Sequence, residues 1–141
     1  MGFATTREER AIALPILQGR VKRQEFVGTM IYKICDTTLW REAERVGLFR
    51  GAGIDMQDGY IHFSSREQVA DTAAKHFAGM ADLVLVAVDA QTLGADLKWE
   101  PARGGALFPH LYGVMPLSAV AWVKPLGLGA DGRHIFPEAA P

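Results

Sequence analysis

The stretch Asp58-Gly59-Tyr60-Ile61-His62-Phe63-Ser64-Ser65 combines a turn, a short strand and the start of a helix. Its Asp-Gly pair is typical of tight turns, because glycine adopts backbone conformations that other residues avoid. The apolar side chains of Ile61 and Phe63 then alternate with their neighbours, which is the period of a half-buried strand. We therefore predict a short strand at 60–63 that leads directly into a helix.

The helix that follows has a capping signal of its own. Ser64-Ser65-Arg66-Glu67 matches a capping box, in which the serine and glutamate side chains bond each other's backbone amides. The apolar residues from Val69 to Phe77 follow at helical spacing. Such a strand-to-helix junction presents free amides that suit a phosphate or carboxylate, so Ser64 and Ser65 are candidate binding residues. Capping alone also explains Ser64, and both interpretations stay open.

Two apolar segments flank this stretch. Met30–Ile34 is rich in β-branched and aromatic residues, and Leu83–Val88 is continuously apolar. The first predicts a strand, and the second predicts a central strand that is covered on both faces. Cap oxygens after residue 35 and a glycine at 47 predict a helix at 38–46. Residues 50–57 contain two glycines and are predicted to form a loop.

The second half of the chain is rich in short strands and turns. We predict, in chain order, a strand at Leu97–Glu100 that Pro101 stops, a turn at Arg103-Gly104-Gly105, an edge strand at Phe108–Tyr112 interrupted by its proline, and a closing strand at 121–123. Strands outnumber helices. The fold class predicted from this pattern is α+β, with a mostly antiparallel sheet and flanking helices.

Length and composition indicate one ordinary globular domain. The chain has 141 residues, about half of them apolar, and a net charge of -1. This charge disfavours nucleic acid and acidic membranes as partners, and no apolar run reaches the roughly 18–20 residues of a membrane-spanning helix. A single cysteine excludes an intramolecular disulfide and fits the cytoplasm. The cysteine and the four histidines (62, 76, 110 and 134) lack zinc-ligand spacing, so we predict no metal.

The two ends of the chain differ from the middle. Residues 1–29 carry five basic and three acidic residues, a net +2, and show no regular apolar period. We predict a loosely attached extension at 1–29, a compact domain at 30–126 and a frayed tail at 127–141.

His62 and His110 are the main candidates for chemistry. His62 lies on a strand beside apolar residues, where a hydrogen-bonded structural role and a functional role are both compatible with the sequence. His110 has a denser polar neighbourhood that includes Glu100, Arg103 and Tyr112. Arg103 either pairs with Glu100 across a turn or, beside its two glycines, forms an anion clamp.

A set of short motifs resembles one bacterial family, the domain of unknown function 952, over about residues 30–126. The motifs are Ile31-Tyr32-Lys33-Ile34, the opening stretch through Ser64, His76-Phe77, Asp82-Leu83-Val84-Leu85, Val88-Asp89, Leu97-Lys98-Trp99-Glu100, Arg103-Gly104-Gly105 and Leu107-Phe108-Pro109-His110-Leu111-Tyr112-Gly113. The resemblance implies an ADP-ribosylation-type fold, a split antiparallel sheet around a cleft that holds NAD in active relatives. The order of the motifs is also similar to that of tRNA 2′-phosphotransferase.

The resemblance implies roles for individual residues. The implied cofactor-binding residues are Lys33, Tyr60, His62, Ser64, Ser65, Arg103 and Tyr112. Lys33 would hold ribose or pyrophosphate, a tyrosine would stack on nicotinamide, the serines would bind ribose hydroxyls and Arg103 the phosphates. His110 is the implied acid or base, since imidazole titrates near neutrality. Glu100 or Asp58 would stabilise the ribosyl cation.

Two departures from the wider group affect the expected activity. Many related enzymes carry His or Arg on the first strand where this chain has Lys33, and transferases that modify proteins carry a late glutamate where it has His110. Residues 1–29 are also too short for the RNA module of the tRNA enzyme. We therefore expect either an enzyme that transfers or hydrolyses ADP-ribose or a non-catalytic module for an anionic metabolite or peptide. In the third interpretation, the motifs are purely structural.

Overall fold

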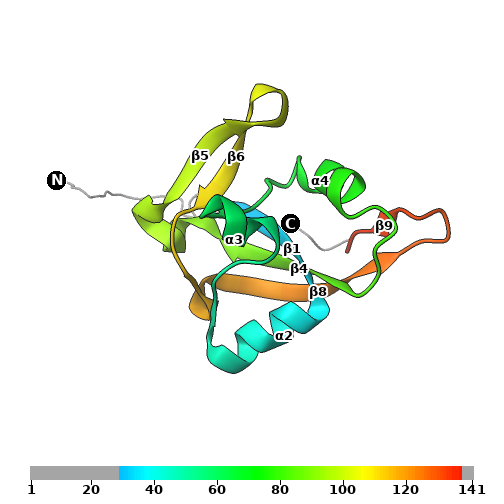
Figure 1. Cartoon of the computed structure of the whole chain (residues 1–141), viewed down its shortest axis with the longest axis horizontal. Helices are drawn as coiled ribbons and strands as arrows, with labels where there is room; N and C mark the ends of the chain where they lie inside the picture. Colours follow the sequence, from blue (N-terminus) through cyan, green and yellow to red (C-terminus); the bar gives the residue numbers. More distant parts are fainter. Residues whose placement is uncertain (1–28, 138–141) are drawn as a thin grey trace, which may run out of the picture.

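The computed structural model describes residues 29–137 (Figure 1), so the predicted N-terminal extension, apart from Thr29, lies outside the described residues. In chain order the elements are β1 (Met30–Asp36), α2 (Thr37–Val46), β2 (Leu48–Phe49), α3 (Ile54–Asp58), β3 (Ile61–His62), α4 (Val69–His76), β4 (Leu83–Asp89), η1 (Ala90–Asp96), β5 (Leu97–Ala102), η2 (Arg103–Gly105), β6 (Ala106–Leu111), β7 (Met115–Pro116), η3 (Leu117–Ala119), β8 (Val120–Leu128) and β9 (His134–Ile135). None of the described helices is long and apolar enough to span a membrane.

The main sheet has the strand order β1-β4-β8-β9, with every neighbouring pair antiparallel. Leu83–Val88 of β4 is buried along its whole length, which confirms the predicted central strand. Alternate β4 side chains enter two separate cores, one shared with Trp40 of α2 and the other with Val69 of α4. The two helices therefore cover opposite faces of the sheet (Figure 1), and the α+β, mostly antiparallel class is confirmed.

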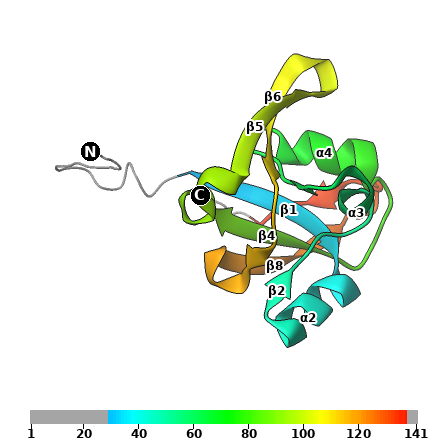
Figure 2. The ribbon, with the colours of Figure 1, turned by 60° about the vertical axis from the view of Figure 1, so that its left-hand side comes forward.

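A smaller sheet has the order β3-β6-β5, and its β5–β6 hairpin extends away from the main sheet (Figure 2). The two sheets are joined through a bridge between Tyr32 of β1 and Ser64, just after β3. The Tyr32 amide donates to the Ser64 carbonyl at 2.8 Å, and the Ser64 amide donates to the Tyr32 carbonyl at 2.9 Å. Beyond this bridge the two sheets diverge (Figure 2), and a cavity lies beside β1.

The two proline predictions in this sheet were wrong. Pro101 does not stop β5, which continues to Ala102, and β6 is the middle strand rather than an edge. Pro101 faces Leu107 in a pair without hydrogen bonds, so its missing N–H points outward from the edge strand β5. Pro109 lies in β6 opposite Phe63, the residue that follows β3, and its carbonyl accepts from the Phe63 amide at 3.0 Å. Pro101 thus costs no ladder hydrogen bond, whereas Pro109 supplies only the carbonyl of its pair with Phe63.

The predicted capping box was wrong by one residue. The Ser65 hydroxyl accepts from the Gln68 amide at 3.2 Å, and the Gln68 side chain accepts from the Ser65 amide at 2.9 Å. The backbone of Ser64 is already engaged in the bridge to β1, and its hydroxyl lies 2.8 Å from that of Thr72. The junction is capped as expected, but one residue later than predicted.

Two further segments differ from the predicted structure. The predicted loop at 50–57 contains α3, a five-residue helix that ends at Gly59, whose φ is 86°. The predicted frayed tail is ordered over much of its length, because β8 continues to Leu128 and pairs with β9. The remaining predicted strands and the helix at 38–46 are present within a few residues of their predicted bounds.

We predict that Leu85→Ala in β4 lowers the free energy of unfolding by about 2–5 kcal/mol, because it leaves a cavity in a fully buried strand. Chemical denaturation measures this change. Leu107→Ala is the matched control, since that leucine is half exposed and its truncation should cost no more than about 0.5 kcal/mol. Equal losses in the two variants would contradict the central position of β4.

Candidate functional site

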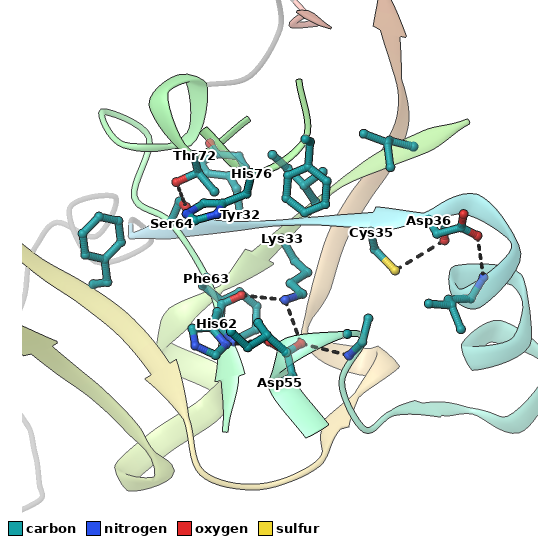
Figure 3. A pocket seen from close by; sticks show the side chains of 18 of the residues that line it. Tyr32, Lys33, Cys35, Asp36, Asp55, His62, Phe63, Ser64, Thr72 and His76 are labelled. Carbon is teal, nitrogen blue, oxygen red and sulfur yellow. Dashed lines mark hydrogen bonds and ion pairs between the residues drawn. The ribbon is translucent and has the colours of Figure 1, made fainter. Parts of the chain in front are cut away.

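Asp55 of α3 is a buried carboxylate with four hydrogen-bond donors around it. One of its oxygens lies 2.7 Å from Lys33 Nζ and accepts from the Ala52 amide at 2.9 Å. The other accepts from the His62 amide at 3.1 Å and lies 2.7 Å from His62 Nδ1. The Lys33 ammonium also donates to the His62 carbonyl at 3.0 Å (Figure 3). One side chain thus links α3, β1 and β3.

The charge of Asp55 is maintained by these partners. Burial alone raises the pKa of the carboxyl, but the hydrogen bond from His62 and the charge of Lys33 outweigh burial, so the net pKa is lower than usual. Lys33 is itself buried, and its ammonium is compensated by this carboxylate. The pair is therefore an ion pair whose members depend on each other.

Gly51 makes room for Asp55. A Cβ at position 51 would lie 2.9 Å from the Asp55 Cβ, and the φ of Gly51 is 122°. No other residue type fits both the space and the backbone conformation. The glycine that was predicted only as part of a loop is therefore required for the placement of the buried carboxylate.

His62 is held by carboxylates on both ring nitrogens. Nδ1 faces Asp55, and Nε2 lies 3.1 Å from an oxygen of Asp58, at the C-terminal end of α3. An imidazole that donates from both nitrogens satisfies this arrangement. Asp58, in the turn Asp58-Gly59, is thus a direct partner of the histidine four residues later.

A second carboxylate–histidine pair lies across the small sheet. Glu100 of β5 is 2.8 Å from His110 Nδ1 and accepts a hydrogen bond from the Tyr112 hydroxyl at 2.7 Å. The bond from Tyr112, followed by that from His110, lowers the pKa of Glu100, and the same bond to Glu100 raises the pKa of Tyr112 to about 12. Glu100 is therefore ionised at neutral pH.

Tyr60 connects the two pairs. Its ring stacks on His110 with centroids 4.3 Å apart and contacts the rings of His62 and Tyr112 at 4.6 and 5.0 Å. The rings of His62 and His110 lie 5.3 Å apart. Four rings and their carboxylates thus form one continuous cluster at the junction of the two sheets.

A cavity of about 570 Å³ opens beside this cluster and surrounds the edge of β1. In Figure 3, Ser64, Thr72 and His76 lie on one side of β1, whereas Lys33, Asp55 and His62 lie on the other. Apolar side chains complete its wall, and three of them remain partly exposed at the surface: Leu39, Ile54 and Met80. The cavity therefore has a polar wall and an apolar rim.

The backbone of Ile34 is an open strand edge inside this cavity. Alternate residues of a strand direct their N–H and C=O groups to the same side, and those of Tyr32 bond Ser64. The corresponding groups of Ile34 therefore also point away from β4, and no partner for them lies within residues 29–137. Ile34 is only 4% exposed. A buried donor and acceptor without partners are rare in folded proteins, and a ligand can satisfy them.

The predicted site residues mostly converge on this region. The cavity is lined by Lys33, Tyr60, His62, Ser64 and His110. Glu100 contacts His110, and Tyr112 donates a hydrogen bond to Glu100, so both residues connect to the cavity through His110. The Ser65 hydroxyl instead caps the turn before α4. Arg103 begins η2 at the tip of the β5–β6 hairpin, next to Ala102, which lines the cavity. Cys35 is buried in the core as predicted, and burial raises its pKa to about 11.

Asp55 and the edge at Ile34 were not predicted as site residues. Asp55 lies in a segment that was predicted to be a loop, and nothing adjacent in sequence identifies Lys33 and His62 as its partners. The two glycines of Gly51-Ala52-Gly53 were the signal available in the sequence, because such glycines allow close approach of the backbone to a neighbouring group. The Ile34 edge follows from strand pairing, which the sequence of β1 does not specify.

Comparison with known proteins identifies the family. The family described as "Protein of unknown function (DUF952)" matches residues 34–123, which is more than half of the chain. The chain belongs to the DUF952 family. No curated protein matches this DUF952 chain.

Solved structures of protein CC0527 from Caulobacter crescentus resemble this chain. Its crystal structure is 50% identical, with a TM-score of 0.74, and the match covers 76% of this chain and 94% of that chain. The solution structure of the same protein is 51% identical, with a TM-score of 0.67, and covers 74% and 90%. The predicted family resemblance is thus confirmed.

We predict that Asp55→Asn lowers the free energy of unfolding by about 3–5 kcal/mol, because it leaves the Lys33 ammonium buried without its counter-ion. Chemical denaturation at neutral pH measures the loss. The control is Asp71→Asn, which removes an exposed pair with Lys75 and should cost at most about 1 kcal/mol.

The same pair predicts a dependence of stability on pH. The folded pKa of Asp55 lies below its unfolded value of about 3.9, so its contribution is complete above that pH and is lost as pH falls through the folded pKa. Below about pH 4, the stability of the wild type should therefore fall more steeply than that of Asp55→Asn. Parallel curves from denaturation at pH 2–7 would show that folding does not lower the pKa of Asp55.

Proposed function

We propose that this DUF952 protein has an ADP-ribosylation-type fold and that its cavity binds NAD or an ADP-ribosylated compound. The observation that carries this proposal is the buried, unpartnered N–H and C=O of Ile34 inside the cavity. A carboxamide such as that of nicotinamide presents an acceptor and a donor in the complementary arrangement. The proposed ligand would satisfy both orphaned groups at once.

The charges around the cavity suit the reactive end of such a ligand. Asp58 and Glu100 place carboxylates beside the ring cluster, and both are accessible to solvent in part. Oxidised nicotinamide carries a positive charge, and the ribosyl group becomes cationic when the glycosidic bond breaks. Negative side chains beside this group would lower the energy of the cationic state.

Lys33 has a different role in this proposal from the one that the family resemblance implied. Its ammonium is already compensated by Asp55 and donates to the His62 carbonyl, so little of its charge remains for a pyrophosphate. We propose that Lys33 holds the cavity wall in place and contacts ribose hydroxyls at most. The phosphates would then lie nearer the cavity mouth, on the side of Ser64 and His76.

The second candidate function is a binding module without turnover, and it rests on the open strand edge and the apolar rim. An extended peptide could pair with β1 at Ile34 and cover Leu39, Ile54 and Met80, which are all partly exposed. An anionic metabolite is favoured less by this geometry, because the buried lysine at the cavity wall is already neutralised.

We predict that NAD and nicotinamide at millimolar concentration shift the backbone amide resonance of Ile34 and of its neighbours in β1. Nicotinic acid, which lacks the amide donor, should bind about tenfold more weakly, since the Ile34 carbonyl then stays unpaired. A heteronuclear NMR titration measures both affinities. Amides of β8 are the internal control, because this strand lies on the far side of β4 from β1. The absence of any shift with NAD and ADP-ribose would refute the proposal.

A further inference from the structure

The Glu100–His110 pair has the geometry of a general base. Glu100 is ionised and accepts from His110 Nδ1 at 2.8 Å, so Nδ1 must carry the proton. In the neutral imidazole the other nitrogen, Nε2, then carries a lone pair. No group within residues 29–137 hydrogen-bonds Nε2, although the His110 side chain is 95% buried and lines the cavity.

His62 contrasts with His110 in this respect. Both nitrogens of His62 face carboxylate oxygens, at 2.7 Å from Asp55 and 3.1 Å from Asp58. Neither nitrogen of His62 is therefore open to a substrate while these contacts last. Of the two histidines in the ring cluster, His110 is the one that can accept a proton from a substrate.

We propose that His110 activates water and that the protein hydrolyses the N-glycosidic bond of an ADP-ribosyl compound such as NAD. This inference rests on the proposed function. His110 Nε2 takes a proton from water, and the water oxygen forms a bond to the anomeric carbon of the ribose. The bond from that carbon to the nicotinamide nitrogen breaks, and its electron pair neutralises the pyridinium. Free ADP-ribose and nicotinamide result, and His110 passes its proton to solvent.

The surroundings of His110 favour water over a larger acceptor. Tyr60 stacks on its ring at 4.3 Å, and the ring of His62 lies 5.3 Å away. A ligand held at Ile34 would fill part of the same 570 Å³ cavity. The His110 side chain is only 5% exposed, which leaves little room for a side chain of another protein, whereas a water molecule needs only the space of a single hydrogen-bonded site.

Glu100 acts in this proposal as a positioning residue. It fixes the proton on Nδ1 and stabilises the imidazolium that forms, as a carboxylate does beside a histidine base. Tyr112 holds the same carboxylate from the other side at 2.7 Å. Lys98, the cross-strand neighbour of His110, is the nearest cation on β5.

The test measures binding and turnover separately on the full chain. NAD is incubated in ¹⁸O-labelled water, the products are analysed by mass spectrometry, and affinity is measured by the NMR titration above. We expect free ADP-ribose that carries one ¹⁸O atom. His110→Gln should slow its formation by about 100-fold or more while NAD affinity changes little. Glu100→Gln should slow it by about tenfold or more, and Glu42→Gln, on the exposed face of α2, should leave it unchanged.

Imidazole rescue distinguishes chemistry from structure. In His110→Ala, added imidazole should restore part of the turnover, whereas a purely structural defect would not respond. If NAD binds but no ADP-ribose forms, or if His110→Gln turns over at the wild-type rate, the hydrolytic inference is overturned and the binding proposal stands. If NAD does not bind at all, both fail.

Discussion

The ion pair between Lys33 and Asp55 is the constraint on which the site depends. Its two members come from β1 and α3, and the same carboxylate also fixes the backbone and ring of His62 in β3. A charge can remain in such a buried place only where its partners offset the cost of leaving water. The main sheet, the short helix and the small sheet therefore meet at one carboxylate, and the position of each limits that of the other two.

This arrangement divides the polar residues of the cavity into two groups. Lys33, Asp55 and His62 satisfy one another and form a rigid wall. The Ile34 backbone and His110 Nε2 retain hydrogen-bonding capacity that the described part of the chain does not use. The first group explains why the two sheets meet with fixed geometry, and the second indicates where a ligand would add contacts.

The sequence predicted the parts of the fold that depend on local patterns. The buried strand at Leu83–Val88 and the capped helix at 38–46 follow from runs of residues that act through their immediate neighbours. Pro101 and Pro109 were misinterpreted because the cost of a missing N–H depends on which side of the strand faces a partner. That information lies in the pairing of strands, not in the residues beside the proline.

The candidate site was predicted in part for the same reason. Glu100 and His110, which were both predicted as catalytic candidates, lie on neighbouring strands of one hairpin, so their closeness in sequence could associate them. Asp55 instead acts on residues 22 positions before and seven positions after it, and its helix is too short to show an apolar period. The family resemblance supplied Lys33 and His62, but not the carboxylate between them.

Pro109 limits the length of the pairing between β3 and β6 in the small sheet. Its carbonyl bonds the Phe63 amide, but it has no N–H to return to Phe63, so the pairing of β3 with β6 ends after two residues. The next residue, Ser64, directs its backbone groups to the opposite side and pairs with Tyr32 of β1. A residue with an amide at this position would supply the second hydrogen bond of this pair and extend the ladder between β3 and β6 by one residue. The extent of the β3–β6 pairing is thus set in part by one hydrogen bond that cannot form.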